Sequence, residues 1–308
     1  MTEKPAVTGE TRVGPTVFAW GTRTYVMGII NVTPDSFSGD GLLADADDGA
    51  AAAAARVEGR ATQTESTEAA AGQARSMVEA GADLLDIGGE STRPGHDLVD
   101  ESEELRRVLP VIRAVRAALP GTPLSVDTTK PGVAAAALDA GADAINDVWG
   151  VRSDDAMARV AAGRGVPIIL MHNRPEPVYE DVVREVIADL RVALDRAVAA
   201  GVERRNVLVD PGIGFGKTAE QNLEVLRRLG ELRVLGRPIV LGTSRKSTLG
   251  KVLGGMAPDQ RVEATVATTA LGVAAGIDVV RVHDVGANLR GARIADAIVR
   301  GGWREEGS

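Results

Sequence analysis

The sequence contains no cysteine, which excludes disulfide bonds and thiolate chemistry. Cysteine usage therefore gives no information about the redox compartment of the protein. Aromatic residues are also scarce, at 3% of the chain against 44% hydrophobic residues, so small aliphatic side chains must fill the core. Acidic residues outnumber lysine and arginine, giving a net charge of −8. This charge argues against a general surface for nucleic acid or anionic membranes, while a local basic pocket for an anionic substrate stays compatible with it.

Long hydrophobic runs are absent from the sequence as well. The longest strongly apolar stretch, 166–171, is far shorter than a transmembrane helix requires. The N-terminal residues lack the apolar core of a signal peptide. We therefore expect a cytoplasmic protein without a membrane or nucleic-acid partner.

Short β-branched segments recur along the chain, each preceded by a turn and followed by a stretch with helical periodicity. Several begin after a glycine that suits a helix C-cap, as in Ala80-Gly81-Ala82-Asp83. Eight alternating units of this kind predict one α/β domain over residues 1–308, a (β/α)8 TIM barrel with its core at about 16–303. The predicted strands are 24–30, 83–89, 123–128, 143–148, 167–172, 206–212, 238–244 and 278–284.

An open, doubly wound sheet is the alternative to the barrel. Its polar side chains would gather at one switch point, whereas here nearly every predicted strand ends in a polar residue. In a barrel all these ends meet at one mouth, so the barrel is preferred. Residues 16–23 predict a short hairpin arm that closes the opposite end, and residues 1–13 and the last few are expected to fray.

Three of the strand ends carry hydrogen-bond acceptors: Asp127, Asn146 and Asp210. Two carboxylates and an amide at one rim suit a flat heterocycle with an amino group and ring N–H donors, much as such groups recognise base edges. The alternative is that the aspartates only cap the following helices. Two roles remain open for Asp86: it either contacts the ligand or stabilises the loop after its strand.

The glycine-rich stretch 210–218 resembles a phosphate loop only superficially. A Walker loop needs glycine where Pro211 stands, and a dinucleotide motif needs glycine where Lys217 stands. Both motifs are rejected. The stretch is interpreted as a turn that lets Phe215 and Lys217 approach a ligand closely.

An anion site is predicted where the last two strands end. In the segment 242–247, Lys246 can donate to a carbonyl or ring nitrogen, and Ser247 opens a helix that can receive a carboxylate. Arg281 and His283 lie two residues apart and thus on one face of the last strand. Barrels commonly hold phosphates in this region.

Taken in order, these motifs resemble the dihydropteroate synthases of the pterin-binding barrel superfamily. The resemblance rests on NVTPDSF, DIGGESTRPG, SVDT, IND, DPGIGFGK, GTSRKS and RVHD, which together cover the chain from about 24 to 300. It implies an alkyl-group transferase that joins 6-hydroxymethyl-7,8-dihydropterin pyrophosphate to 4-aminobenzoate in folate biosynthesis and releases pyrophosphate. It also implies a homodimer and Mg2+ as cofactor.

The resemblance further implies a role for each matching residue. Asn31 would bind Mg2+, and Asp35 would steady a cation formed on the pterin. The remaining roles fall into three sets. The pterin set is Asp127, Asn146, Met171, Asp210 and Lys246; the pyrophosphate set is Asn31, Arg281 and His283; the 4-aminobenzoate set is Phe37, Thr92, Arg93, Pro94, Phe215 and Ser247. The catalytic residues would be Asn31, Asp35, Lys246, Arg281 and His283.

The segment between the first two strands departs from the family pattern. Its alanine-rich part, 44–60, is predicted to be an insertion above the barrel mouth, beside a loop that carries Phe37 and covers the site. The first barrel helix is predicted to start at Thr62, which forms a capping box with Glu65 and precedes a face of Ala70, Ala74 and Met77.

Two other functions share features with this pattern. A methyltetrahydrofolate–corrinoid methyltransferase domain has the same barrel and acidic floor, but should lack the NVTPDSF loop and the anion site. A non-catalytic pterin-binding paralogue should have lost loop or anion residues. This sequence keeps all of them.

Overall fold

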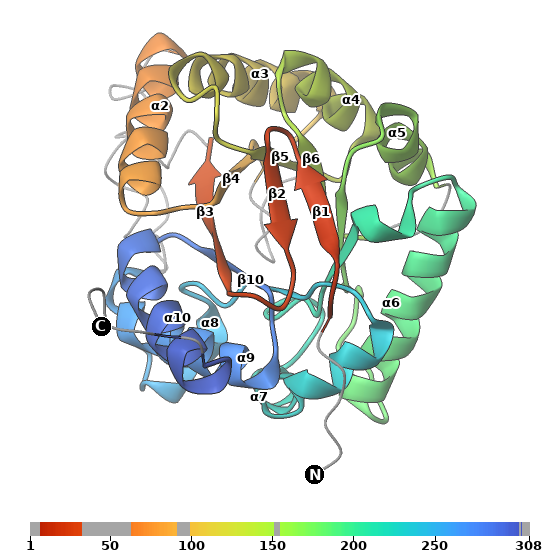
Figure 1. The fold of residues 1–308 in the computed structure, drawn as a ribbon, viewed down its shortest axis with the longest axis vertical. Helices are drawn as coiled ribbons and strands as arrows, with labels where there is room; N and C mark the ends of the chain where they lie inside the picture. Colours follow the sequence, from red (N-terminus) through yellow and green to blue (C-terminus); the bar gives the residue numbers. More distant parts are fainter. Residues whose placement is uncertain (1–6, 33–62, 91–98, 151–154, 302, 304–308) are drawn as a thin grey trace, which may run out of the picture.

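The structure, a computed structural model, describes residues 7–32, 63–90, 99–150, 155–301 and 303. Within these residues eight parallel strands form the central sheet, and two further strands form a separate hairpin (Figure 1). The hairpin strands are β1 (Glu10–Val13) and β2 (Thr16–Ala19). The sheet strands are β3 (Tyr25–Asn31), β4 (Leu84–Gly88), β5 (Leu124–Asp127), β6 (Ala144–Asp147), β7 (Ile168–Met171), β8 (Val207–Asp210), β9 (Val240–Leu241) and β10 (Val279–Val282).

The eight strands close on themselves. Their order is β8-β7-β6-β5-β4-β3-β10-β9, and the two ends of this order are joined by a parallel bridge between Val209 and Ile239. The Val209 N–H also donates to Pro238 O at 3.0 Å. The sheet is therefore the predicted (β/α)8 barrel and not an open sheet.

Helices surround the barrel as an outer ring (Figure 1). Helix α6 illustrates why they form: Val183, Val186, Leu190 and Leu194 lie on one buried face at helical spacing, and the Asp181 side chain caps the N-terminus. The α-helices are α2 (Gln63–Glu79), α3 (Glu101–Ala118), α4 (Pro131–Ala140), α5 (Ala156–Arg164), α6 (Val182–Ala199), α7 (Ala219–Arg227), α8 (Ser247–Val252), α9 (Val262–Ala275) and α10 (Val285–Val299). Short 3-10 helices are η1 (Arg204–Asn206), η2 (Leu229–Leu235) and η3 (Pro258–Gln260).

The hairpin lies across one end of the barrel, where Figure 1 shows it in front of the strands. Its Val13 and Phe18, with Trp20 just beyond it, pack in one buried cluster with inward side chains from the starts of the barrel strands. The hairpin thus closes the end opposite the mouth, as predicted.

The predicted hairpin boundaries, 16–23, and the fraying of residues 10–13 are wrong. The first strand begins at Glu10, because Thr11 is held on both sides. Its hydroxyl donates to Arg205 O at 2.6 Å and accepts the Trp20 indole N–H at 2.9 Å. Only two residues of this strand, Thr11 and Val13, are buried, and so short an alternation does not reveal a strand in the sequence.

Three helix-to-strand junctions use the predicted glycines. Gly81, Gly141 and Gly276 have φ values of +98°, +116° and +89°, in the left-handed region that favours glycine. The first barrel helix, α2, begins at Gln63, and its Ala70, Ala74 and Met77 are buried as predicted. The insertion 44–60 and the cap residue Thr62 lie outside the described residues.

Candidate active site

The carboxyl ends of four barrel strands bring four polar side chains together. Asp86 from β4, Asp127 from β5, Asn146 from β6 and Asp210 from β8 are all buried. Because parallel strands of a barrel share one direction, these ends meet at the same mouth. We refer to Asp86, Asp127, Asn146 and Asp210 as the polar floor.

Asp86 connects the floor. Its two carboxylate oxygens accept hydrogen bonds from the Ser125 hydroxyl at 2.6 Å, the Asn146 amide at 2.9 Å and Arg281 Nε at 2.6 Å. The sequence left its role open between ligand contact and loop brace. The structure instead has it orient Asn146 and Arg281 from a fully buried position.

Arg281 lies between two carboxylates of the floor. Besides its bond to Asp86, its Nη2 donates to Asp127 Oδ2 at 2.6 Å. Burial raises the pKa of Asp127 above its ordinary value, and the Arg281 guanidinium acts in the opposite direction. Burial likewise raises the pKa of Asp210, against the hydrogen bond that the Gly212 N–H donates to Asp210 Oδ1 at 2.7 Å.

One oxygen of the floor lacks a hydrogen bond. Asp127 Oδ1 is buried and has no partner among the described residues. Leaving a buried carboxylate oxygen unpaired is costly, so such an atom points to a ligand donor. The floor therefore offers an acceptor to a molecule that enters the mouth.

An apolar patch stands beside the floor. Val148, Met171 and Phe215 form a small buried cluster of their own. The Lys246 ammonium lies 4.0 Å from the centroid of the Phe215 ring, a cation–π contact. Apolar side chains beside hydrogen-bond acceptors suit a planar heteroaromatic ring.

A second polar group joins the ends of β3, β9 and β10. His283 Nδ1 lies 2.9 Å from the Ser244 hydroxyl, and its Nε2 lies 3.4 Å from Asn31 Nδ2. His283 thus lies between the hydroxyl of Ser244 and the side-chain amide of Asn31. The neighbouring Arg245 has φ +57°, a strained conformation of a kind that clusters at functional sites.

The structure gives the two basic residues of the last strand different partners. Arg281 bonds to Asp86 and Asp127 of the floor, whereas His283 contacts Asn31 and Ser244. Sequence reasoning missed the ion pairs of Arg281, because nothing local to it signals its distant partners. Ser244 was visible only as a polar residue at a strand end.

Two further residues selected from the sequence, Ser247 and Lys217, have defined positions in the structure. Ser247 is exposed at the first position of α8. Lys217 directs its ammonium to His172 Nδ1 and two backbone oxygens. The residues predicted on the first two loops fall outside the described residues: Asp35, Phe37, Thr92, Arg93 and Pro94.

A clustered metal centre is not found in the described part of the chain, which contains no group of three or more His, Cys, Asp or Glu side chains suited to hold an ion. In the same residues, no helix is long and apolar enough to cross a membrane.

Comparison with known proteins agrees with this geometry. The family model described as "Pterin binding enzyme" matches residues 57–283. The chain is 44% identical to the dihydropteroate synthase of Clostridium beijerinckii, over 94% of this chain and 99% of that protein. It is also 44% identical to the Bacillus subtilis enzyme, over 95% of each chain.

Solved structures give the same result. The dihydropteroate synthase of Clostridium difficile, determined in the presence of pteroic acid, superposes with a TM-score of 0.81 at 47% identity, covering 92% of this chain and 99% of that one. The Xanthomonas albilineans enzyme with 4-aminobenzoic acid has a TM-score of 0.82 at 40% identity, covering 96% and 98%.

An eight-stranded barrel with an acidic floor and this family match defines the class: the chain belongs to the pterin-binding enzymes. Within that family its activity is that of the dihydropteroate synthases, transferases of folate biosynthesis. The resemblance inferred from the sequence is confirmed.

Proposed function

We propose that the floor of this chain binds 6-hydroxymethyl-7,8-dihydropterin pyrophosphate, and that the chain condenses it with 4-aminobenzoate. The unpaired Asp127 Oδ1 is the observation that supports this most directly. An amino group and a ring N–H of a pterin would donate to Asp127 and Asp210, while Asn146 is held by Asp86 to face the same ring. Met171 and Lys246 would contact the ring from its faces and edge.

The pyrophosphate would lie over Asn31 and His283. Their side chains already adjoin each other, and the Ser244 hydroxyl holds the opposite nitrogen of the His283 ring. Arg281 uses two of its five N–H donors on carboxylates, and the other donors take no partner among the described residues. It can thus contact a phosphate oxygen without leaving the floor.

Mg2+ would be held by Asn31 together with the substrate. Mg2+ favours one or two protein oxygens, with phosphate oxygens and water completing its shell. Asn31 directs its Nδ2 toward His283, so its Oδ1 is the ligand atom that fits this role. When bound, the ion would neutralise charge on the leaving pyrophosphate.

The 4-aminobenzoate would bind against Phe215 and Ser247. Phe215 belongs to the apolar patch beside the floor, and Ser247 opens α8 directly after Lys246. Phe37, Thr92, Arg93 and Pro94 would complete the pocket, and Asp35 would steady the cation; these five residues lie outside the described part.

The reaction proceeds in two steps. The exocyclic C–O bond breaks first, and the electron pair leaves with the pyrophosphate, toward Arg281 and His283. The amino nitrogen of 4-aminobenzoate then forms the new C–N bond and loses a proton. Electrostatic stabilisation of the departing charge by fixed donors is the main contribution of the protein.

A homodimer formed through the last helices is part of this proposal. Large apolar side chains stand exposed on α9, on α10 and just after it: Leu271 is 71% exposed, Ile294 65%, Ile298 78% and Trp303 73%. Exposed apolar side chains gathered on adjacent helices are typical of an association surface. A cytoplasmic location stays a prediction.

Pyrophosphate release tests the reaction. The wild-type chain should release pyrophosphate from the dihydropterin substrate in the presence of 4-aminobenzoate and Mg2+, and much less without either. Asp127→Asn should weaken pterin binding strongly, because it replaces one accepting carboxylate oxygen with a donating NH2 group and removes the negative charge. Stable pterin binding without any turnover would refute the transferase assignment.

A further inference from the structure

The ammonium group of Lys217 is surrounded by protein acceptors. Its Nζ lies 2.9 Å from His172 Nδ1, 3.0 Å from Gly212 O and 3.0 Å from Phe215 O. An ammonium group has three N–H donors, so these acceptors use all of them. Lys217 thus faces the protein and not a ligand, in contrast to the interpretation from sequence.

These contacts restrain the turn of residues 212–217, which we call the Phe215 turn. Gly212, Gly214 and Gly216 all have positive φ, at +67°, +82° and +53°. Glycines in such a turn have wide conformational freedom unless other contacts remove it. Lys217 contributes to that restraint, since it bonds the carbonyl oxygens of Gly212 and Phe215, beside the hydrogen bonds that Asp210 and Asn222 accept from the turn.

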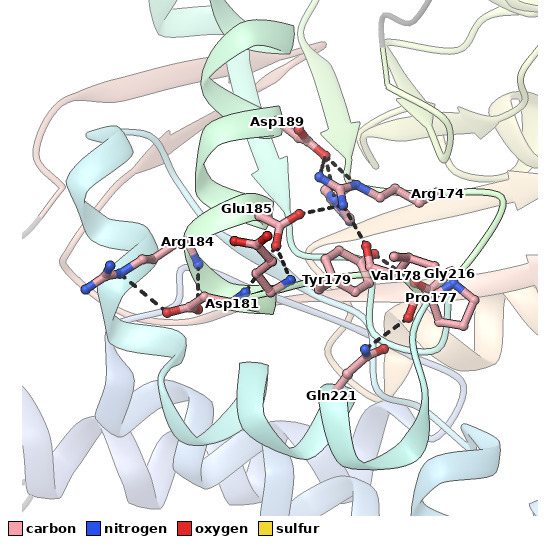
Figure 2. Close-up of polar contacts among 12 residues, drawn as sticks. Arg174, Pro177, Val178, Tyr179, Asp181, Arg184, Glu185, Asp189, Gly216 and Gln221 are labelled. Atoms are coloured by element: carbon pink, nitrogen blue, oxygen red, sulfur yellow. Dashed lines mark hydrogen bonds and ion pairs between the residues drawn. The ribbon is translucent and has the colours of Figure 1, made fainter.

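A chain of polar contacts continues from Lys217 into the loop after β7. His172 Nε2 lies 3.1 Å from Asp189 Oδ2, which also accepts from Arg174 Nε at 2.9 Å. Burial and the Lys217 ammonium lower the pKa of His172, so the ring is neutral and its Nδ1 accepts. Figure 2 shows Arg174 between Asp189 and Glu185, with Nη1 donating to Glu185 Oε2 at 2.7 Å.

The same loop contacts the Phe215 turn directly. The Tyr179 hydroxyl donates to Gly216 O at 2.7 Å (Figure 2), and the Arg174 guanidinium lies 4.6 Å from the centre of the Tyr179 ring. A side chain at Gly216 would overlap the backbone of Arg174. The loop and the Phe215 turn are therefore packed directly against each other.

We propose that Lys217 is a positioning residue of the active site, which holds the Phe215 turn so that Phe215 and Lys246 meet the substrates. Phe215 lies on this turn, and the stem of Lys246 packs on Gly214, where the Cβ of any larger residue would lie 3.0 Å from Lys246 Cδ. The inference rests on the proposed function of the site. Because the leaving-group residues Arg281 and His283 come from another strand, Lys217 acts on binding and not on the departing charge.

The test compares Lys217→Met with Arg116→Met. Methionine keeps the length of the stem and removes the three donors. Arg116 is a matched control, since it also bonds backbone carbonyls, those of Gly141, Pro120 and Thr122, but at the hairpin end of the barrel. We expect Lys217→Met to raise KM for 4-aminobenzoate roughly tenfold and to change kcat less than about threefold. Arg116→Met should lower the melting temperature and leave KM unchanged.

Hydrogen exchange gives a readout that does not depend on turnover. In Lys217→Met the amides of Gly212, Gly214 and Phe215 should exchange faster, while the barrel strands keep their protection. Tyr179→Phe, which removes only one hydroxyl, should raise KM about threefold in the same direction. Unchanged KM and unchanged exchange in both variants, with an active wild type, would overturn the role of Lys217; an inactive wild type would instead overturn the proposed function.

Discussion

At the scale of single residues, Arg281 has two tasks that compete. It neutralises Asp86 and Asp127 in the floor, and in our proposal it also contacts the pyrophosphate. Removing one partner of a buried ion pair typically costs about 3–5 kcal/mol, because the other charge stays buried and uncompensated. Arg281→Ala is therefore a poor probe of the anion site, since it disturbs the whole floor.

His283→Ala is the sharper test at this scale. Its ring contacts Asn31 and Ser244, so the variant should retain affinity for the unphosphorylated pterin. Affinity for the pterin pyrophosphate should fall by about one to two decades, as expected for one lost contact to a charged group. Calorimetric titration of both ligands checks this, with Arg281→Ala expected to weaken both. Equal losses for His283→Ala would assign His283 to the fold alone.

At the scale of elements, three junctions between a helix and a strand repeat one arrangement. Asp83, Asp143 and Asp278 each follow a left-handed glycine and accept the backbone N–H of a residue at an adjacent strand. Asp83 and Asp143 also form ion pairs, with Arg23 and Arg116. For Asp278 no such ion pair is found within the described residues, and burial raises its pKa to about 6.

Asp278 should therefore make stability depend on pH. Its pKa in the unfolded chain is about 3.9, so between about pH 4 and 6 the folded state holds more proton than the unfolded state. The contribution of Asp278 to the free energy of unfolding is present below pH 4. It is lost as the pH rises through the pKa of the folded state, by about 3 kcal/mol in total. Asp278→Asn keeps an acceptor for the Ile239 N–H. The free energy of unfolding of this variant should depend less on pH between pH 4 and 6.

Urea unfolding at a series of pH values measures the effect. Asp259→Asn serves as the control, because Asp259 is an exposed acid in η3. A profile that keeps the same slope between pH 4 and 6 in Asp278→Asn would mean that another group causes it.

At the scale of the whole molecule, the apolar side chains on α9 and α10 predict association. Ile298→Glu places a charge on this surface and should convert the proposed dimer to a monomer, because a buried unpaired carboxylate is strongly unfavourable. Val192→Glu is the matched control: Val192 is 58% exposed on α6, at a different side of the barrel (Figure 1). Light scattering after gel filtration gives the mass of each variant. A wild-type monomer, or an unchanged dimer in Ile298→Glu, would contradict the prediction.

The sequence by itself determined the barrel and the order of its parts. Strand and helix alternate in the printed residues, and their periodicity is local. All eight barrel strands were therefore found, although β9 covers only two of the seven residues predicted for it. The polar residues at the strand ends are visible in the sequence for the same reason. Their convergence follows once the fold is known to be a barrel, because its parallel strands end at one mouth. The glycine junctions followed for the same reason, since a left-handed cap is a property of a few adjacent residues.

Only the tertiary structure decided which of these groups bond to each other. Arg281 and Asp86 are 195 positions apart, and Thr11 and Arg205, which fix the start of the hairpin, are 194 apart. Contacts at such separation depend on closure of the barrel and leave no local pattern. Lys217 is the plainest case: its glycine-rich surroundings suggest a ligand, but packing of the loop after β7 supplies His172 as its partner. Local sequence determines where a side chain lies along a helix or strand. Closure of the barrel determines which distant residues that side chain contacts.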